Sequence, residues 1–281
     1  MKADEIQGLE YSIVPLFEED DYSFTELFHE YTKLNRANTH VIASRVPAIL
    51  RDPKLRAMMA RSWKTYRGHE RLPLPSPHLG EMTLEEALRN RCSLSSVPGA
   101  EFSGDPINLA DLGSVLGYSY GVTHSHPIQG LHQVQHFRAT PSAGALYPLE
   151  IYALVFRVEG LNEGVYHYGV VDHCLEVVRK GPVRDEFLKT TTYYDMCSKA
   201  PVVLVVTSVF QRSLFKYQYR GYRFIMNDVG ALLQSFYLVT TALGLGTCAL
   251  AGFFDDEVGN LIGINNVDEA VAICFLLGPL K

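Results

Sequence analysis

Cysteine and tryptophan are scarce in this sequence, with five and one among 281 residues. The cysteines are odd in number and no two are spaced as Cys-x-x-Cys, so neither a disulfide framework nor a zinc ribbon is indicated. This usage fits a reduced, cytosolic setting. Basic residues are also few: 25 Lys and Arg against 31 Asp and Glu give a net charge of −6. Nucleic acid is therefore not expected as the main ligand, because phosphate backbones favour basic surfaces.

Long hydrophobic runs are missing as well. No stretch approaches the roughly 18 apolar residues that span a bilayer, and the first ten residues lack the apolar core of a signal peptide. The composition, 47% hydrophobic and 20% charged, is ordinary for a globular protein with a sizeable core. We therefore expect a cytoplasmic protein with neither a membrane nor a nucleic acid as its partner.

A proline-rich stretch divides the chain. Residues 72–78, Leu-Pro-Leu-Pro-Ser-Pro-His, contain three prolines, which remove backbone donors and fix φ, so an extended linker is predicted. This linker lies at the C-terminal end of a predicted N-terminal extension, residues 1–80. Within the extension, residues 24–34 show helical apolar spacing, and the basic stretch 51–67 is also predicted to be helical. The main domain, residues 81–281, begins at a capping-box pattern, Thr83-Leu-Glu-Glu86.

Helices and strands are mixed in the main domain. The β-branched run 201–209 predicts a central strand, 149–156 and 270–277 two more, and 164–168 with 174–178 a hairpin. Helices are predicted at 84–88, 109–116, 224–243 and 255–262. Because the two types do not alternate regularly, an α+β fold with a sheet flanked by helices is favoured.

The most unusual stretch lies at the start of the long helix. Three cations, at 216, 220 and 223, alternate there with tyrosines at 217, 219 and 222. Buried cations need partners, and phenols beside cations can have shifted pKa values. On residue types alone, a solvated turn with extended side chains is the simpler interpretation.

Histidines gather at 124, 126, 132 and 136. His-x-His and a pair four residues apart can bind a metal, but no cysteine or carboxylate lies close by in the sequence. The stretch is bounded by Gly and Pro, so a loop that faces the substrate is expected instead of a metal site.

Several long motifs resemble one family. The run Lys-Tyr-x-Tyr-Arg-Gly-Tyr-Arg at 216–223, the run Arg-Ala-Thr-Pro-Ser-Ala-Gly-Ala-Leu-Tyr-Pro at 138–148 and Gly-Val-Tyr-His-Tyr at 164–168 are similar to those of SagB-type dehydrogenases. These are flavin oxidases of thiazole/oxazole-modified peptide synthetases of the microcin type, within the flavin nitroreductase superfamily. The resemblance spans roughly residues 83 to 278.

The resemblance implies a nitroreductase-like fold with a mainly antiparallel sheet, and a homodimer with two FMN molecules at the subunit interface. The implied activity is the oxidation of thiazolines and oxazolines in a heterocyclised precursor peptide. The implied partners are an ATP-dependent cyclodehydratase and a leader-peptide-binding protein. The long helix starting at Phe224 would then lie in the dimer interface.

It also implies roles for particular residues. The implied cofactor-binding residues are Arg89, Arg91, Ser93, Arg138, Pro141, Ser142, Ala143, Gly144, Ala251 and Gly252. Within this set, Arg91 and Ser93 suit the flavin phosphate, although Cys92 and Ser95 depart from the usual run. Without the resemblance, the two arginines would be cations at a helix C-terminus and the 141–144 run an ordinary tight turn.

Tyr217 is the candidate catalytic base and Lys216 its activator. Adjacent residues on a helix do not face each other, so the two side chains are expected to converge through a non-helical backbone that Gly221 permits. The ammonium would favour the phenolate form of Tyr217, and burial would oppose it. Tyr217 can therefore act as the base only if the effect of the charge exceeds that of burial, or if the proton moves together with the hydride. Tyr217 could otherwise be a packed aromatic residue.

Two other functions fit parts of the sequence. One is a nicotinamide-dependent flavin reductase acting on nitro or enone compounds, which would not need the Lys216-Tyr217 pair. The other is a non-catalytic scaffold subunit of a peptide-modifying complex, which the irregular phosphate run supports.

Overall fold

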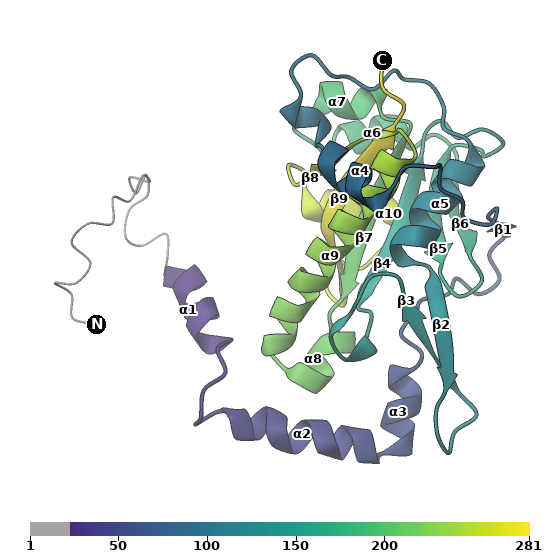
Figure 1. The fold of residues 1–281 in the computed structure, drawn as a ribbon. Coiled ribbons are helices and arrows are strands. Elements are labelled where there is room, and N and C mark those ends of the chain that lie inside the picture. Colours follow the sequence, from purple (N-terminus) through teal and green to yellow (C-terminus); the bar gives the residue numbers. More distant parts are fainter. Residues whose placement is uncertain (1–22) are drawn as a thin grey trace.

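A computed structural model describes residues 23–281 of the chain (Figure 1). Its centre is a seven-stranded sheet of order β1-β6-β5-β4-β7-β9-β8, and a separate ribbon of β2 and β3 extends from one end. Each neighbouring pair in both sheets is antiparallel, which confirms the expected α+β class. The strands are β1 Arg71–Pro73, β2 Val122–Pro127, β3 Val134–Arg138, β4 Leu149–Val155, β5 Gly164–Gly169, β6 Cys174–Lys180, β7 Val202–Val209, β8 Gly246–Leu250 and β9 Glu269–Gly278.

Helices cover both faces of the sheet. They are α1 Ser23–Tyr31, α2 Thr39–Arg51, α3 Pro53–Met59, α4 Leu84–Asn90, α5 Leu109–Tyr120, α6 Arg184–Leu188, α7 Tyr194–Lys199, α8 Gln211–Tyr217, α9 Arg220–Ala242 and α10 Asp255–Ile262. Within residues 23–281, none of them combines the length and the apolar character that crossing a bilayer demands.

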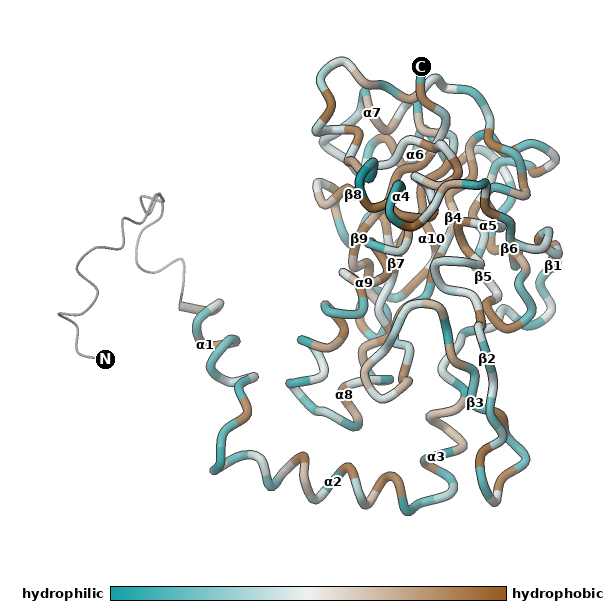
Figure 2. The backbone as a smooth tube through the Cα atoms, in the orientation of Figure 1, coloured by the Kyte–Doolittle hydropathy of each residue, from teal (hydrophilic) through white to brown (hydrophobic). Residues whose placement is uncertain are grey.

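The sheet separates two hydrophobic cores. Along β4, Ile151 and Ala153 pack into the core formed with α5 and α9, whereas Tyr152 and Leu154 pack into the core formed with α6, α7 and α10. This alternation follows from the two-residue period of a strand, and both faces are buried, as the continuous apolar run of β7 predicted. Figure 2 shows the apolar residues concentrated in these central strands.

The long helix α9 lies along one face of the sheet (Figure 1). Its buried side chains include Ile225, Leu232 and Phe236, and the Phe236 ring lies 5.1 Å from that of Phe275 on β9. The helix confirms the prediction from apolar spacing. It begins four residues earlier than predicted, and the short helix α8 precedes it.

The part of the N-terminal extension that is described, from residue 23, runs beneath the α8–α9 corner (Figure 1). Arg223 Nε donates to Thr32 Oγ1 at 2.8 Å, and Arg45 Nε donates to the carbonyl of Phe215 at 2.6 Å. Residues 1–22 lie outside the described part of the chain. The domain boundary near residue 80 remains a prediction.

Two local predictions in the extension are wrong. The basic stretch 51–67 was expected to be helical, yet α3 ends at Met59, because the backbone amides of Lys64 and Tyr66 bind carboxylates of the sheet. The predicted linker 72–78 includes part of strand β1, which pairs with β6. Pro73 is tolerated there because β1 is an edge strand, where a missing donor costs little.

Candidate active site

The stretch with alternating cations and tyrosines forms the corner between α8 and α9. Strand β7 delivers the chain to α8, which ends at Tyr217 because Gln218 adopts φ +49°. Lys216 is buried, with 5% of its surface exposed, and its Nζ lies 5.1 Å from the centre of the Tyr217 ring. A solvated turn is therefore excluded for these two residues.

Both side chains reach the same point of a neighbouring turn. A methyl group placed on Gly144 would lie 2.5 Å from the Tyr217 hydroxyl oxygen and 2.7 Å from Lys216 Nζ. The expected convergence is present, but its expected cause is wrong. Lys216 and Tyr217 belong to the last turn of α8, the break follows at Gln218, and Gly221 is already helical.

The turn itself has an unusual backbone. Gly144 has φ +67°, and two larger residues, Ala145 and Tyr147, have φ +52° and +41°. The Ser142 side chain braces the turn by accepting a hydrogen bond from the Tyr147 amide at 2.9 Å. Left-handed residues with side chains are costly and gather at functional sites, so this turn, residues 141–147, is a candidate binding element.

Burial sets the protonation of Lys216 and Tyr217. It lowers the pKa of the Lys216 amine. Burial raises the pKa of the Tyr217 phenol, and the negative charge of Asp228 raises it further. The charge of Lys216 therefore does not prevail over desolvation, and the phenol is protonated at neutral pH.

Asp228 is a site residue that the sequence did not single out. It is the sole acidic residue of α9 and lies on the buried side of the helix. Burial raises the pKa of its carboxyl to about 6, against the opposing effect of hydrogen bonds from the Ser142 side chain and the Ala143 amide. A lone acid within an apolar helical pattern is the signal that could have identified it.

A second group of predicted cofactor residues lies further along α9. The Arg91 guanidinium carbon is 5.2 Å from the centre of the Tyr237 ring, and the Tyr237 hydroxyl donates to Ser93 Oγ at 3.3 Å and accepts from the Ala249 amide at 2.9 Å. Strand β8 then leads directly to Ala251 and Gly252. Tyr237 and Asp228 are nine residues apart, or about 13 Å along a helix.

Two predicted arginines have partners within the chain. Arg89 is exposed and pairs with Glu85 at 2.9 Å. Arg138 is buried between the rings of Tyr120 and Tyr147, with its Nη2 donating to the Ser62 carbonyl. Its Nη1 is buried and has no hydrogen-bond partner in the described part of the chain.

Three of the four histidines lie in strands, so the expected loop is wrong for them, whereas His132 lies in the loop that joins β2 and β3. Residues 124, 126 and 136 belong to the β2–β3 ribbon, where the rings of His124 and Phe137 stack at 4.7 Å and Ser125 Oγ lies 2.8 Å from His136 Nδ1. Cross-strand packing of this kind stabilises a two-stranded ribbon. Among residues 23–281, no three His, Cys, Asp or Glu side chains gather as a metal ion would require.

Known proteins resemble the chain at several levels. Residues 101–278 match the Nitroreductase family. The chain is 34% identical over 188 residues to a protein of Methanocaldococcus jannaschii named as a nitroreductase, covering 67% of this chain and 88% of that protein. It is 31% identical over 149 residues to the microcin B17-processing protein McbC of Escherichia coli, covering 51% of this chain and only 55% of McbC.

Solved structures share the fold. A structure from Anabaena variabilis, described as a nitroreductase, matches with a TM-score of 0.67 and 25% identity over 90% of this chain and 45% of that chain. A chain of the E. coli microcin synthetase McbBCD complex with truncated pro-MccB17 bound matches with a TM-score of 0.58 and 21% identity, over 94% of this chain and 95% of that chain. These likenesses, together with the observed sheet, confirm the nitroreductase-like fold.

The close approach at Gly144 gives a first prediction. Gly144→Ala should destabilise the protein more than Gly130→Ala, which also replaces a left-handed glycine (φ +77°) but has open space around it. The backbone cost alone is about 1 to 2 kcal/mol at each position, and only residue 144 adds a collision. Urea unfolding measures the difference, and a crystal structure should show both side-chain tips displaced. Equal losses in the two variants, with the tips in place, would contradict the geometry.

Proposed function

The chain belongs to the nitroreductase family, and from this premise we propose that it is an FMN-dependent dehydrogenase. Its substrate is a heterocyclised precursor peptide, whose thiazoline and oxazoline rings it oxidises to thiazoles and oxazoles during biosynthesis of a microcin-like natural product. The observation that carries the proposal is the meeting of Lys216 and Tyr217 at Gly144. The similarity to McbC, a protein named for microcin B17 processing, gives the substrate class.

The residues fit a bound FMN. The missing side chain at Gly144 makes room for the tips of Lys216 and Tyr217. Pro141, Ser142 and Ala143 of the same turn have small side chains, which let a flat ring approach the backbone. Arg91 and Ser93 combine a cation with a hydroxyl, which suits a phosphate. Ala251 and Gly252 follow β8 next to that pair, and Arg138 has a free buried donor. When bound, FMN supplies the acceptor for the hydride that leaves the azoline ring.

The chain's own groups handle the proton. Oxidation of an azoline removes one hydride and one proton. The Tyr217 hydroxyl receives the proton from the ring carbon, and because burial keeps the phenol protonated, it must release its own proton in the same step. Lys216 Nζ lies at the same point of the turn, and its lowered pKa makes it more readily a neutral acceptor.

The exposed side of α9 supports a homodimer. The resemblance implies a flavin at a subunit interface, and the 141–144 turn and the Arg91–Ser93 group both lie next to α9. The exposed side of α9 offers a contact surface, which includes Tyr222, Met226 and Gly230. A side chain at Gly230 would meet nothing within 4 Å, which leaves room for another helix. We further propose a complex with an ATP-dependent cyclodehydratase and a leader-peptide-binding protein, by analogy with the microcin synthetase.

The cofactor assignment predicts different effects for two neighbouring arginines. Arg91→Ala should lower flavin occupancy, because it removes the cation proposed to hold the phosphate. Arg89→Ala is the matched control. Although the resemblance implied a cofactor role for Arg89 as well, its guanidinium is exposed and paired with Glu85, so we do not assign it to the flavin and expect occupancy close to wild type. The ratio of absorbance at about 450 nm to that of the protein measures occupancy. If both variants keep the wild-type ratio, the phosphate does not bind at Arg91.

The activity is tested by mass spectrometry. A heterocyclised peptide incubated with the FMN-loaded protein should lose about 2 Da per ring, the mass of two hydrogens. Tyr217→Phe should slow this loss about 100-fold or more, the scale of a lost general base. Tyr194→Phe, in which an exposed tyrosine of α7 changes, should retain the wild-type rate.

Other outcomes identify the other functions. Steady consumption of NADPH with no change in peptide mass indicates a flavin reductase. Failure to bind FMN indicates a scaffold subunit. If Tyr217→Phe converts the peptide at the wild-type rate, the phenol is not the base.

A further inference from the structure

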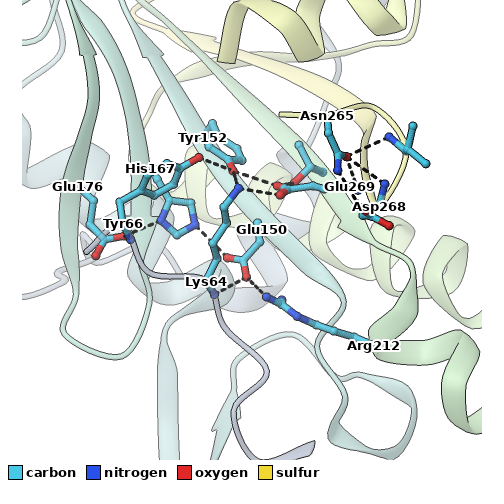
Figure 3. Close-up of polar contacts among 12 residues, drawn as sticks. Lys64, Tyr66, Glu150, Tyr152, His167, Glu176, Arg212, Asn265, Asp268 and Glu269 are labelled. Atoms are coloured by element: carbon cyan, nitrogen blue, oxygen red, sulfur yellow. Dashed lines mark hydrogen bonds and ion pairs between the residues drawn. The ribbon is translucent and has the colours of Figure 1, made fainter. Parts of the chain in front are cut away.

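Three buried charged residues lie side by side on adjacent strands (Figure 3). Glu150 on β4, His167 on β5 and Glu176 on β6 have side chains that are at most 2% exposed. His167 bridges the other two, with Nε2 3.0 Å from Glu150 and Nδ1 2.9 Å from Glu176. We call these residues the buried triad. The proposed chemistry uses none of them.

The triad is ionised. Burial by itself lowers the pKa of His167, but hydrogen bonds to both carboxylates outweigh it and raise that pKa. Burial raises the pKa of Glu150, yet Arg212 and His167 together hold it well below its usual range. Two carboxylates and one imidazolium leave a net negative charge, and an unpaired buried charge is strongly destabilising. Arg71 approaches Glu176, with its Nε 3.4 Å from Oε1, and a second cation approaches Glu150.

Arg212 supplies that cation from the first turn of α8. Its Nη2 lies 2.6 Å from Glu150 Oε1, and its Nη1 donates to the carbonyl of Tyr147 at 3.1 Å. Tyr147 ends the turn that carries Gly144. One guanidinium therefore joins Glu150 of the sheet (Figure 3) to the left-handed turn and to the helix that bears Lys216 and Tyr217.

Helix α8 depends on such contacts. It has seven residues and no side-chain cap at its N-terminus, and isolated helices this short are unstable in water. Arg212 and Lys216 are four residues apart, so they project from the same side of the helix. That side thus faces the turn at two points, with Arg212 hydrogen-bonded to the Tyr147 carbonyl and Lys216 Nζ next to Gly144.

The N-terminal extension completes the arrangement. The Lys64 amide donates to Glu150 Oε1 at 2.7 Å, and Lys64 Nζ pairs with Glu269 at 2.8 Å. Residues 64–66 thus lie over the triad and meet the carboxylate that holds Arg212 (Figure 3). Replacing them with water would weaken the pairing, since exposed ion pairs contribute little.

We propose that Glu150 is a positioning residue of the active site, which acts through Arg212 to hold α8, and with it Lys216 and Tyr217, against the turn at Gly144. The effect of Glu150 on azole formation rests on the proposed function, whereas its effect on the position of α8 does not. Glu150 touches neither substrate nor cofactor in this account.

The chain offers a matched control for the test. Glu150→Gln and Glu176→Gln each remove one equally buried negative charge from His167, but only Glu150 contacts Arg212. Hydrogen–deuterium exchange of residues 211–217 reports the attachment of α8 without relying on activity. The amides of β7 report global unfolding, so a general loss of stability can be subtracted.

Glu150→Gln should accelerate exchange in α8 about 10-fold relative to β7, corresponding to about 1.4 kcal/mol, and should lower azole formation per bound flavin similarly. Glu176→Gln should change neither by more than about 2-fold, whatever it costs in melting temperature. If Glu150→Gln fails to fold, Arg212→Gln tests the same link from the helix side, with Glu150 still paired to His167.

Unchanged α8 exchange in Glu150→Gln or Arg212→Gln, or equal acceleration in Glu176→Gln, would overturn the proposal. If the wild-type protein forms no azole, the proposed function fails, and the exchange data still decide whether Glu150 positions α8.

Discussion

The absence of a side chain at Gly144 is the constraint on which the site depends. The tips of Lys216 and Tyr217 occupy the space that a Cβ would need. For both to reach that point, α8 must end at Tyr217 and the turn must adopt a left-handed backbone. Neither is favourable alone, because a seven-residue helix is marginal and left-handed Ala145 and Tyr147 are strained. The surrounding structure must therefore stabilise both.

Buried charge provides that stabilisation. The triad joins three strands, and Arg212 extends it to the helix and the turn. A hydrophobic cluster of the same volume could be as stable, but it would not fix the direction of a guanidinium or the orientation of α8. The charged arrangement thus favours one geometry at the cost of desolvation. Asp228 of α9 also contacts the turn, at Ser142 and Ala143, and its raised pKa reflects burial there.

Much of the fold could be predicted from the sequence, because apolar periodicity directly reflects burial. The spacing in α9 and the β-branched run of β7 indicated the correct elements, and the capping box on Thr83 marked the start of α4. The triad could not be predicted. Each of these three residues, Glu150, His167 and Glu176, alternates with apolar or aromatic neighbours along its strand. In such a pattern a polar residue normally faces solvent. Their burial depends on Lys64 and Tyr66, which are distant in sequence. Similarly, the resemblance identifies the 216–217 pair, whereas only the three-dimensional structure shows that the two side chains meet at Gly144.

The proposed reaction requires that the peptide itself reduces the flavin. The most direct measurement mixes FMN-loaded protein with an azoline peptide anaerobically, without nicotinamide, and follows absorbance at about 450 nm. We predict a fall in absorbance accompanied by one new azole ring per flavin reduced, because hydride and proton leave the same ring. If the absorbance falls only after NADH or NADPH is added and the peptide mass stays unchanged, the protein is a nicotinamide-dependent reductase and the account is contradicted.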